Sequence, residues 1–361
     1  MGLRSSSPAL RGLLDGSRHE DRAMSLTDQA ARIEECSPAT PEIPAPIQAE
    51  RYLLAIDLPM RHAGLRRVSL RVECVGPAHA PAVWVAGGIS ANRHVLANAL
   101  DGFDGWWQGC AGPGHALDPR RHRLLSFDWV GADGDLDAPI DTADQADAIA
   151  LALDALGIAR LHAFVGASYG GMVALQFAAR HPLRVARLAV ISAADRPHPF
   201  ASAFRALQRQ VVALGQLQCA DELGLSLARQ LAMLSYRSPR EFGQRFDAPA
   251  RIEGGRACCA AEDYLQACGQ KYVARWSATA FLRLSESIDL HHVDPAAVHA
   301  PTSLLAVEGD WLAPPEQLEA LAGRLAGAAR LQTITSAYGH DAFLKEPQAI
   351  DALLRHTLAP C

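Results

Sequence analysis

The stretch VGASYGG, residues 165–171, decides the fold of this chain of 361 residues. It sets Ser168 between Gly166 and Gly170, directly after an apolar run and directly before a helical pattern at Met172–Arg180. A nucleophile on a sharp turn from strand to helix has strained backbone geometry, and neighbouring chain must approach it closely. An ordinary glycine-rich turn is the alternative, because a bare Gly-x-Ser-x-Gly is common by chance. The strand before the motif and the helix after it favour Ser168 as a nucleophile.

Strand and helix patterns alternate on both sides of this motif. A helical pattern covers residues 143–156. Short apolar strand patterns occur at Val68–Val72, Val83–Val85, Leu124–Phe127, Ala163–Val165, Leu188–Ile191, Ser303–Val307 and Leu331–Ile334. Alternation of this kind predicts an α/β fold, in which helices cover both faces of a mostly parallel sheet.

The alternation stops between Arg196 and His291, where only amphipathic helical patterns occur. This interval predicts a helical lid inserted into the sheet. We therefore expect a core at residues 49–195 and 296–361, and a helical lid at residues 196–295. Residues 1–48 hold Ser, Arg, Asp and Pro clusters without a sustained apolar period, so we expect a disordered N-terminal extension there.

Charge and cysteine content exclude several classes of protein. Lys and Arg total 34 against 39 Asp and Glu, whereas a protein devoted to nucleic acid usually carries a basic excess. No apolar run reaches the ~18–20 residues that span a bilayer. The eight cysteines lack Cys-x-x-Cys spacing, which argues against a disulfide scaffold and a zinc site. We therefore expect a cytoplasmic protein with reduced cysteines, no metal, no phosphate-binding loop, and no nucleic acid or membrane partner.

A serine nucleophile needs a base, and the base needs an acid that orients it. In this fold the acid follows a late strand, and Asp310 follows the strand pattern at residues 303–307. The histidine follows the last strand, where His340 stands beside a glycine, whereas the other histidines after Ser168 fit surface or helix-end positions. Glu308 competes with Asp310, but its place at the strand end points it less freely toward the loop. The sequence predicts the triad Ser168, Asp310 and His340.

Two backbone N–H groups are expected to form the oxyanion hole. One belongs to Tyr169, the residue after the nucleophile, and the other to Ile89 in the glycine-containing loop after an early strand. Gly87-Gly88 as a plain turn is the alternative for that loop.

Further segments carry a resemblance to a known family. They run in order from about residue 84 to 345, and several lie in the lid, where a generic hydrolase would not match. They are residues 105–107, 112–118, 170–176, 207–210, 228–238, 242–246, 264–273, 282–289, 310–317 and 339–344. These segments resemble the homoserine O-acetyltransferase/O-succinyltransferase family of the α/β-hydrolase fold.

The resemblance implies a ping-pong acyl transfer in methionine biosynthesis. Acyl-CoA is then a co-substrate rather than a resident cofactor, and L-homoserine is the acceptor. In such enzymes a lid arginine holds the amino acid carboxylate, and the matching position implied here is Arg209. The acidic residue beside the catalytic histidine, Asp341, would bind the substrate ammonium. A solvated helix charge is the alternative for Arg209. The family also implies a homodimer formed through the lid.

The acyl donor depends on residues that depart from the family pattern. Ala167 and Tyr169 replace the usual residues around the nucleophile, and a short acidic loop at residues 129–141 replaces a longer one. Succinyl-using relatives tend to carry an arginine after the Asp-Trp pair of the acid loop, and Leu312 stands at that position here. The sequence thus slightly favours acetyl-CoA over succinyl-CoA, although Arg93 offers a cation from the oxyanion loop.

Other functions share parts of this pattern. An esterase or thioesterase would use the same triad but would not need the lid segments. Serine as the acceptor differs from homoserine by one methylene, which is worth only ~1–3 kcal/mol. A catalytically inactive binding scaffold is the remaining alternative, and the presence of all three triad residue types argues against it.

Overall fold

An eight-stranded sheet forms the centre of residues 47–359, the part of the chain that the computed structural model describes. Its strands stand in the order β1-β2-β4-β3-β5-β6-β9-β10. Their bounds are β1 Ala49–Met60, β2 Gly64–Val75, β3 Ala82–Ala86, β4 Arg123–Phe127, β5 Ala163–Ala167, β6 Leu188–Ile191, β9 Thr302–Glu308 and β10 Ala329–Thr335. The six strands from β4 to β10 in this order pair in parallel, which confirms the predicted α/β fold. The predicted disordered extension, residues 1–48, lies outside the described residues except for its last two positions.

Continuous burial explains why the central strands were visible in the sequence. Every residue of β4, β5 and β6 is buried, as expected for parallel strands covered on both faces. The long hairpin β1–β2 differs, because it pairs antiparallel from Ala49 opposite Val75 to Met60 opposite Gly64. Only Val68–Val72 of this hairpin was predicted, and β1 was not.

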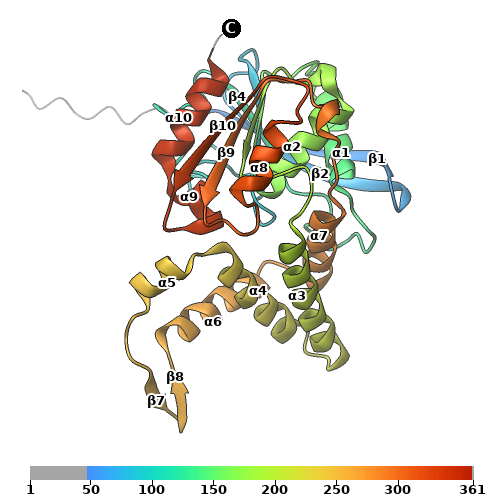
Figure 1. The fold of residues 1–361 in the computed structure, drawn as a ribbon. Helices are drawn as coiled ribbons and strands as arrows, with labels where there is room; N and C mark the ends of the chain where they lie inside the picture. Colours follow the sequence, from blue (N-terminus) through green and yellow to red (C-terminus); the bar gives the residue numbers. More distant parts are fainter. Residues whose placement is uncertain (1–46, 360–361) are drawn as a thin grey trace, which may run out of the picture. The chain divides into compact units, whose positions relative to one another are not determined.

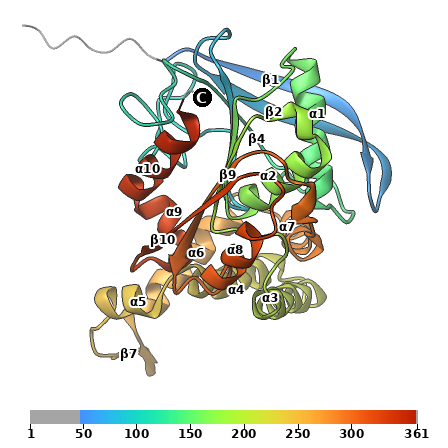
Figure 2. The same ribbon diagram turned by 45° about the horizontal axis from the view of Figure 1, so that its top comes forward.

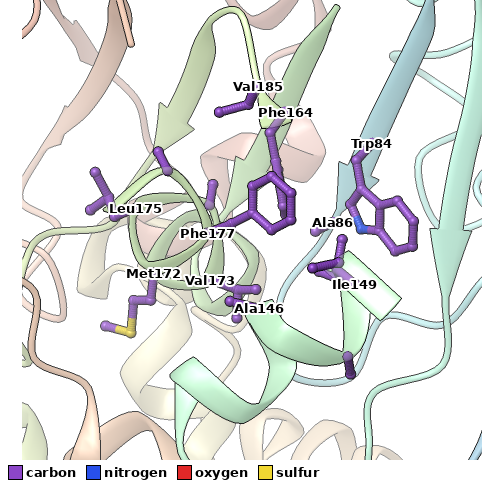
Figure 3. Packing of buried hydrophobic residues seen from close by; sticks show 14 of the residues in the cluster. Trp84, Ala86, Ala146, Ile149, Phe164, Met172, Val173, Leu175, Phe177 and Val185 are labelled. Carbon is purple, nitrogen blue, oxygen red and sulfur yellow. The ribbon is translucent and has the colours of Figure 1, made fainter. Parts of the chain in front are cut away.

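Helices cover the two faces of the sheet. On one face α2 (Tyr169–Arg180) packs against β3, β5 and β6, and α1 (Thr142–Ala155) packs against α2 and the hairpin β1–β2. Helix α8 (Pro315–Ala322) packs against β9 and β10. Figure 3 shows Phe164 of β5 and Phe177 of α2 facing each other, with Trp84 of β3 beside them and Ile149 of α1 below. The other face carries α9 (Ala342–Lys345) and α10 (Pro347–Leu358). Three short 3-10 helices, η1 Pro182–Arg184, η2 Pro295–Ala297 and η3 Gly339–Asp341, lie in the connections.

The lid occupies the interval between β6 and β9. Figures 1 and 2 show its helices gathered at one end of the sheet, with a small hairpin projecting from them. Its helices are α3 Pro199–Leu217, α4 Asp221–Tyr236, α5 Pro239–Arg245, α6 Ala260–Val273 and α7 Ala278–Leu290, and the hairpin is β7 Arg251–Glu253 with β8 Arg256–Cys258. Helices α3 and α4 approach so closely that a Cβ added to Gly215 would lie 2.8 Å from the Cα atom of Gly224.

The two chain connections of the lid lie side by side at its root. His291, which follows α7, is buried and its Nε2 atom lies 3.0 Å from the carbonyl oxygen of Ala194, which follows β6. The N–H of Val293 donates to the carbonyl oxygen of Asp195 at 2.9 Å. On its other side, His291 Nδ1 lies 2.8 Å from the hydroxyl of Thr142 at the start of α1. The chain therefore leaves the core and returns to it at neighbouring points.

No helix among residues 47–359 is both long enough and apolar enough to cross a membrane.

Candidate active site

Ser168 lies on a sharp turn between β5 and α2. Its φ of 55° and ψ of −121° fall in a backbone region that residues other than glycine rarely adopt. A Cβ at Gly166 would lie 2.2 Å from the carbonyl oxygen of Gly170, and a Cβ at Gly170 would lie 2.2 Å from that of Ala86. The flanking glycines are therefore required by close backbone approach, as the sequence motif predicted.

The structure brings Ser168, His340 and Asp310 together. His340 Nε2 lies 2.7 Å from Ser168 Oγ, and His340 Nδ1 lies 2.7 Å from Asp310 Oδ2. The other oxygen of Asp310 accepts hydrogen bonds from the N–H groups of Leu312 and Ala313, which hold the carboxylate in place. Glu308, the competing acid, is exposed and accepts a hydrogen bond from Thr335 instead.

His340 is arranged to accept a proton from the serine. Because the Asp310 carboxylate requires an N–H at Nδ1, the Nε2 atom has a free lone pair facing the Ser168 hydroxyl. Burial lowers the pKa of His340, but the charge of Asp310 and its hydrogen bond outweigh burial, so the pKa is raised above its ordinary value. A more basic imidazole is better able to take the serine proton.

The two predicted oxyanion donors lie at the start of α2 and in the loop after β3. The N–H groups of Ile89 and Tyr169 have no protein acceptor within the described residues. The N–H of Gly170 donates to the carbonyl oxygen of Gly87 at 2.9 Å, which ties the loop to the helix start. The indole of Trp129 donates to the carbonyl oxygen of Gly88 at 3.1 Å. Two free amides beside a nucleophile are what a tetrahedral oxyanion requires.

A cavity of about 290 Å³ lies over Ser168, between the core loops and the lid. The core contributes the oxyanion loop, Ser168, Leu312, His340 and Asp341. The lid contributes mainly α3, α4 and α7, with Tyr272 from α6. Side chains from both the core and the lid would therefore contact a molecule bound in the cavity.

Three arginines of the lid line this cavity, and they differ in their partners. Arg237 forms ion pairs with Asp341 at 2.8 Å and with Glu241 at 2.7 Å. Arg205 pairs with Asp289 of α7. Arg229 has no carboxylate partner among the described residues, and its guanidinium instead faces the rings of Tyr272 and Tyr236, 4.8 and 5.5 Å from their centres.

Arg209 does not line the cavity, contrary to what the resemblance implied. Its Nη1 atom donates to Asp289 Oδ2 at 2.7 Å and to the Ser285 hydroxyl at 3.0 Å, so it joins α3 to α7. The helical period turns Arg205 and Gln208 toward the cavity and leaves Arg209 against α7. Arg229 does line the cavity, and it was not among the predicted site residues. It lies within the matched segment 228–238, which was the only signal for it.

Asp341 lies where the resemblance placed it, in the cavity wall beside His340. Burial raises the pKa of this carboxyl, and the charge of Arg237 opposes that rise. The aspartate is thus a buried acid held in part by a lid arginine, and an ammonium group in the cavity would be a second partner for it.

Two of the three elements considered for the acyl group, Arg93 and the loop at residues 129–141, lie outside the cavity wall. Arg93 forms an ion pair with Asp128, and it is not among the lining residues. The short loop at residues 129–141 contributes none of the lining residues, and its Asp137 pairs with Arg283 of the lid at 2.7 Å. Leu312 does line the cavity. Residues 47–359 hold no cluster of side chains suited to a metal ion.

The chain is similar to several known proteins in sequence and in structure. Residues 88–347 match the family described as the alpha/beta hydrolase fold. The chain is 57% identical over 349 residues to a homoserine O-succinyltransferase of Xanthomonas campestris pv. campestris, covering 96% of this chain and 94% of that protein. It is 33% identical to a homoserine O-acetyltransferase of Thermus thermophilus, covering 70% of this chain and 72% of that protein. A substituted form of esterase E22 has a similar solved structure, with a TM-score of 0.76, 19% identity and coverage of 87% of this chain and 100% of that chain.

Proposed function

This chain belongs to the alpha/beta hydrolase fold family and, within it, to the homoserine O-acyltransferases, and from that premise we propose its reaction. The protein transfers an acyl group from acyl-CoA to the hydroxyl of L-homoserine. The transfer follows a ping-pong mechanism and is a step of methionine biosynthesis. The observation that carries the proposal is the hydrogen-bonded chain of Ser168, His340 and Asp310 at the floor of a cavity. The lid side of this cavity holds the guanidinium of Arg229, which has no carboxylate partner within residues 47–359.

In the first half-reaction, Ser168 Oγ attacks the thioester carbonyl carbon while His340 Nε2 takes the serine proton. The N–H groups of Ile89 and Tyr169 stabilise the negative charge on the carbonyl oxygen. The C–S bond then breaks, and the thiolate of CoA receives the proton from His340. The products of this step are CoA and an ester between the acyl group and Ser168.

In the second half-reaction, the γ-hydroxyl of homoserine attacks the same carbonyl carbon, and His340 takes its proton. The bond between the acyl carbon and Ser168 Oγ breaks, and the proton returns from His340 to the serine oxygen. The O-acylhomoserine leaves and the enzyme is restored. Asp310 stays ionised throughout and stabilises the imidazolium that forms in each step.

The amino acid head group is assigned to Arg229 and Asp341. A guanidinium recognises a carboxylate through two parallel hydrogen bonds, and Arg229 has no competing carboxylate among the described residues. Asp341 is a buried carboxylate beside His340 and fits the ammonium group. The charge of Arg229 also acts on Asp341, which places the two opposite charges near each other, as the head group of an amino acid requires.

Succinyl-CoA is the donor that we propose. The relative at 57% identity is named a homoserine O-succinyltransferase, whereas the acetyl-named relative cited above is 33% identical. The presence of Leu312 in place of an arginine was the reason to expect acetyl-CoA. Leu312 forms only one part of the cavity wall, however, and a cation elsewhere in that wall can bind a succinyl carboxylate equally well.

CoA release under four conditions tests the function, with succinyl-CoA or acetyl-CoA as donor and with homoserine present or absent. We expect steady release that depends on homoserine, and no release above background in Ser168→Ala. Ser168→Ala activity above about a tenth of wild type would contradict the acyl-serine mechanism, because removing a triad member typically lowers the rate by ~10⁴-fold or more. Release that is equally fast without homoserine would favour the esterase or thioesterase alternative.

We also propose that the protein is a homodimer that works in the cytoplasm. The lid exposes several leucines of α3 and α4, which a second copy would cover. All six cysteines in the described part of the chain are free thiols, which suits a reducing compartment where acyl-CoA and amino acids are available.

A further inference from the structure

The lid carries a positive charge that the amino acid head group does not use. Arg205 and Arg209 stand one turn apart on α3, and both pair with the same carboxylate, Asp289 of α7. Within residues 47–359 no second acid pairs with either arginine, so two guanidinium groups share one carboxylate and one positive charge remains. By contrast, the ion-pair cluster of Arg237, Asp341, Glu241 and Arg245 contains two cations and two anions.

The uncompensated charge faces the cavity through Arg205. Its Nε and Nη2 atoms donate to Asp289 Oδ1, at 2.9 and 2.6 Å, and Nη2 also donates to the Ser202 hydroxyl at 3.0 Å. The remaining nitrogen, Nη1, has no hydrogen-bond partner within the described residues, and Arg205 lines the cavity whereas Arg209 does not. An arginine fixed along one edge and free at the other is oriented to receive an anion from the cavity.

The two available guanidiniums belong to different walls. Arg229 of α4 stacks on Tyr272 of α6 and lies near Asp341, which is the arrangement that an amino acid head group needs. Arg205 stands on the wall that α3 forms with Ser285 and Ile288 of α7. Its charge also acts on His340, which indicates that it is close to the reacting atoms. The cavity therefore has places for two separate carboxylates.

We propose that Arg205 binds the terminal carboxylate of the succinyl group, both in succinyl-CoA and in the acyl-serine intermediate, and that it is the residue that selects succinyl over acetyl. Asp289 and Arg209 act as positioning residues: the aspartate fixes the guanidinium, and the second arginine prevents the aspartate from cancelling its charge. This inference rests on the proposed acyl transfer. An acetyl group has no carboxylate, so it gains nothing from Arg205.

The rival explanation is a purely structural role for Arg205, whose ion pair with Asp289 joins α3 to α7. Loss of such a structural contact would affect both donors alike, because loosening the lid disturbs the whole cavity. The ratio of kcat/KM for succinyl-CoA to that for acetyl-CoA separates the two roles, since folding and the amount of active enzyme cancel in the ratio.

The test measures this ratio at saturating homoserine in wild type, Arg205→Met and Arg205→Lys, with Arg283→Met as the matched control. Arg283 is also a lid arginine with two acidic partners, Asp137 and Glu286, but it lies outside the cavity wall. We expect the ratio to exceed one in wild type and to fall about 10–100-fold in Arg205→Met, the range typical for loss of a hydrogen bond between charged groups. Arg205→Lys keeps the charge and should lose less, and Arg283→Met should keep the wild-type ratio.

Equal losses for both donors in Arg205→Met, an unchanged ratio, or a wild-type preference for acetyl-CoA would each overturn the assignment of Arg205. If Arg205→Met does not fold, Arg205→Lys decides, because its ratio should still fall below that of wild type. A different result would contradict the proposed function itself: wild-type enzyme would then show no homoserine-dependent CoA release with either donor.

Discussion

Two aromatic faces, rather than a carboxylate, hold Arg229 at the cavity wall. Cation–π contacts of this kind are worth about 0.5–2 kcal/mol, and they leave the N–H groups in the plane of the guanidinium free. Burial raises the pKa of the Tyr272 phenol, so the ring stays neutral near pH 7 and does not pair with the arginine as an anion. Arg229 is therefore oriented without being neutralised, which suits the recognition of an incoming carboxylate.

Replacing Arg229 should damage use of the acceptor far more than acylation of the enzyme. In Arg229→Met we expect a burst of CoA equal to the enzyme concentration, followed by turnover that is reduced about 10–100-fold at subsaturating homoserine, because a hydrogen-bonded charge pair is lost. Stopped-flow detection of CoA separates the two phases. In Arg283→Met, which replaces a lid arginine outside the cavity wall, the KM for homoserine should stay within about twofold of wild type. A lost burst in Arg229→Met would place this arginine at the donor end instead.

The triad was predictable because its residues follow the ends of strands. Which lid arginines face the cavity was not predictable from the sequence. Ser168, Asp310 and His340 each follow a strand at the same edge of a parallel sheet, so a correct strand order brings them together. Arg205, Arg209 and Arg229 lie on helices, where one step along the chain turns a side chain by about 100°. Whether such a residue faces the cavity depends on how α3, α4 and α7 pack, and a sequence rich in arginine does not reveal that.

At the scale of elements, continuous apolar runs explain which strands could be predicted. Strands β3 to β6 and β9 are short and mostly apolar, and all five were predicted within a few residues of their observed bounds. Strand β10, Ala329–Thr335, was also predicted, although polar residues alternate with its apolar ones. Strand β1 was missed because it is an edge strand whose side chains alternate between exposed and half-buried, with Leu53 69% exposed. Strand β1 forms because it pairs with β2, and its own sequence does not reveal that pairing.

Burial keeps the ring of His291, at the root of the lid, neutral near pH 7. Nε2 must donate to the carbonyl oxygen of Ala194, so Nδ1 is the acceptor for the Thr142 hydroxyl. Burial lowers the pKa of His291 to about 4, while the backbone carbonyl and nearby carboxylates oppose that shift. The unfolded chain takes up this proton near pH 6.5 and the folded chain does not, so His291 contributes stability above that pH and the contribution is lost as the pH falls toward 4.

The free energy of unfolding should therefore fall by about 2 kcal/mol between pH 7 and pH 5 because of this one group. His291→Gln keeps a donor and an acceptor but does not titrate, so its loss over the same interval should be smaller by that amount. Urea unfolding of both proteins at the two pH values gives the double difference, in which other titrating groups cancel. An equal loss in both proteins would show that His291 is not the group responsible.

At the scale of the whole molecule, the lid exposes an apolar surface. Helix α3 exposes Leu207, Leu214 and Leu217, with exposed fractions of 56, 60 and 82%. Helix α4 exposes Leu223, Leu227 and Leu234 as well. The sequence pattern of α3 indicated an amphipathic helix, but its buried residues are Ala201, Gln208 and Val212. The leucines are therefore available for association.

The proposed dimer makes a direct prediction for Leu214→Glu combined with Leu217→Glu. Light scattering after gel filtration should give roughly twice 38.6 kDa for wild type and 38.6 kDa for the double variant, because two buried charges would disrupt an apolar interface. Leu183→Glu is the control, since Leu183 is 84% exposed but lies on η1 of the core. Wild type that stays at the monomer mass at micromolar concentration would contradict the dimer.

The adjacent ends of the lid segment determine how this part of the protein can be exchanged. Because the carbonyl oxygens of Ala194 and Asp195 meet His291 and Val293 directly, the inserted segment leaves the core and returns to it at neighbouring points. A segment with adjacent ends can be exchanged as a cassette without breaking the continuity of the remaining chain. Ser168 and His340 belong to the core, whereas Arg205 and Arg229, which we propose bind the substrate carboxylates, belong to the lid segment. Recombination at this one junction would thus alter which molecules are recognised while leaving the bond-making chemistry in place.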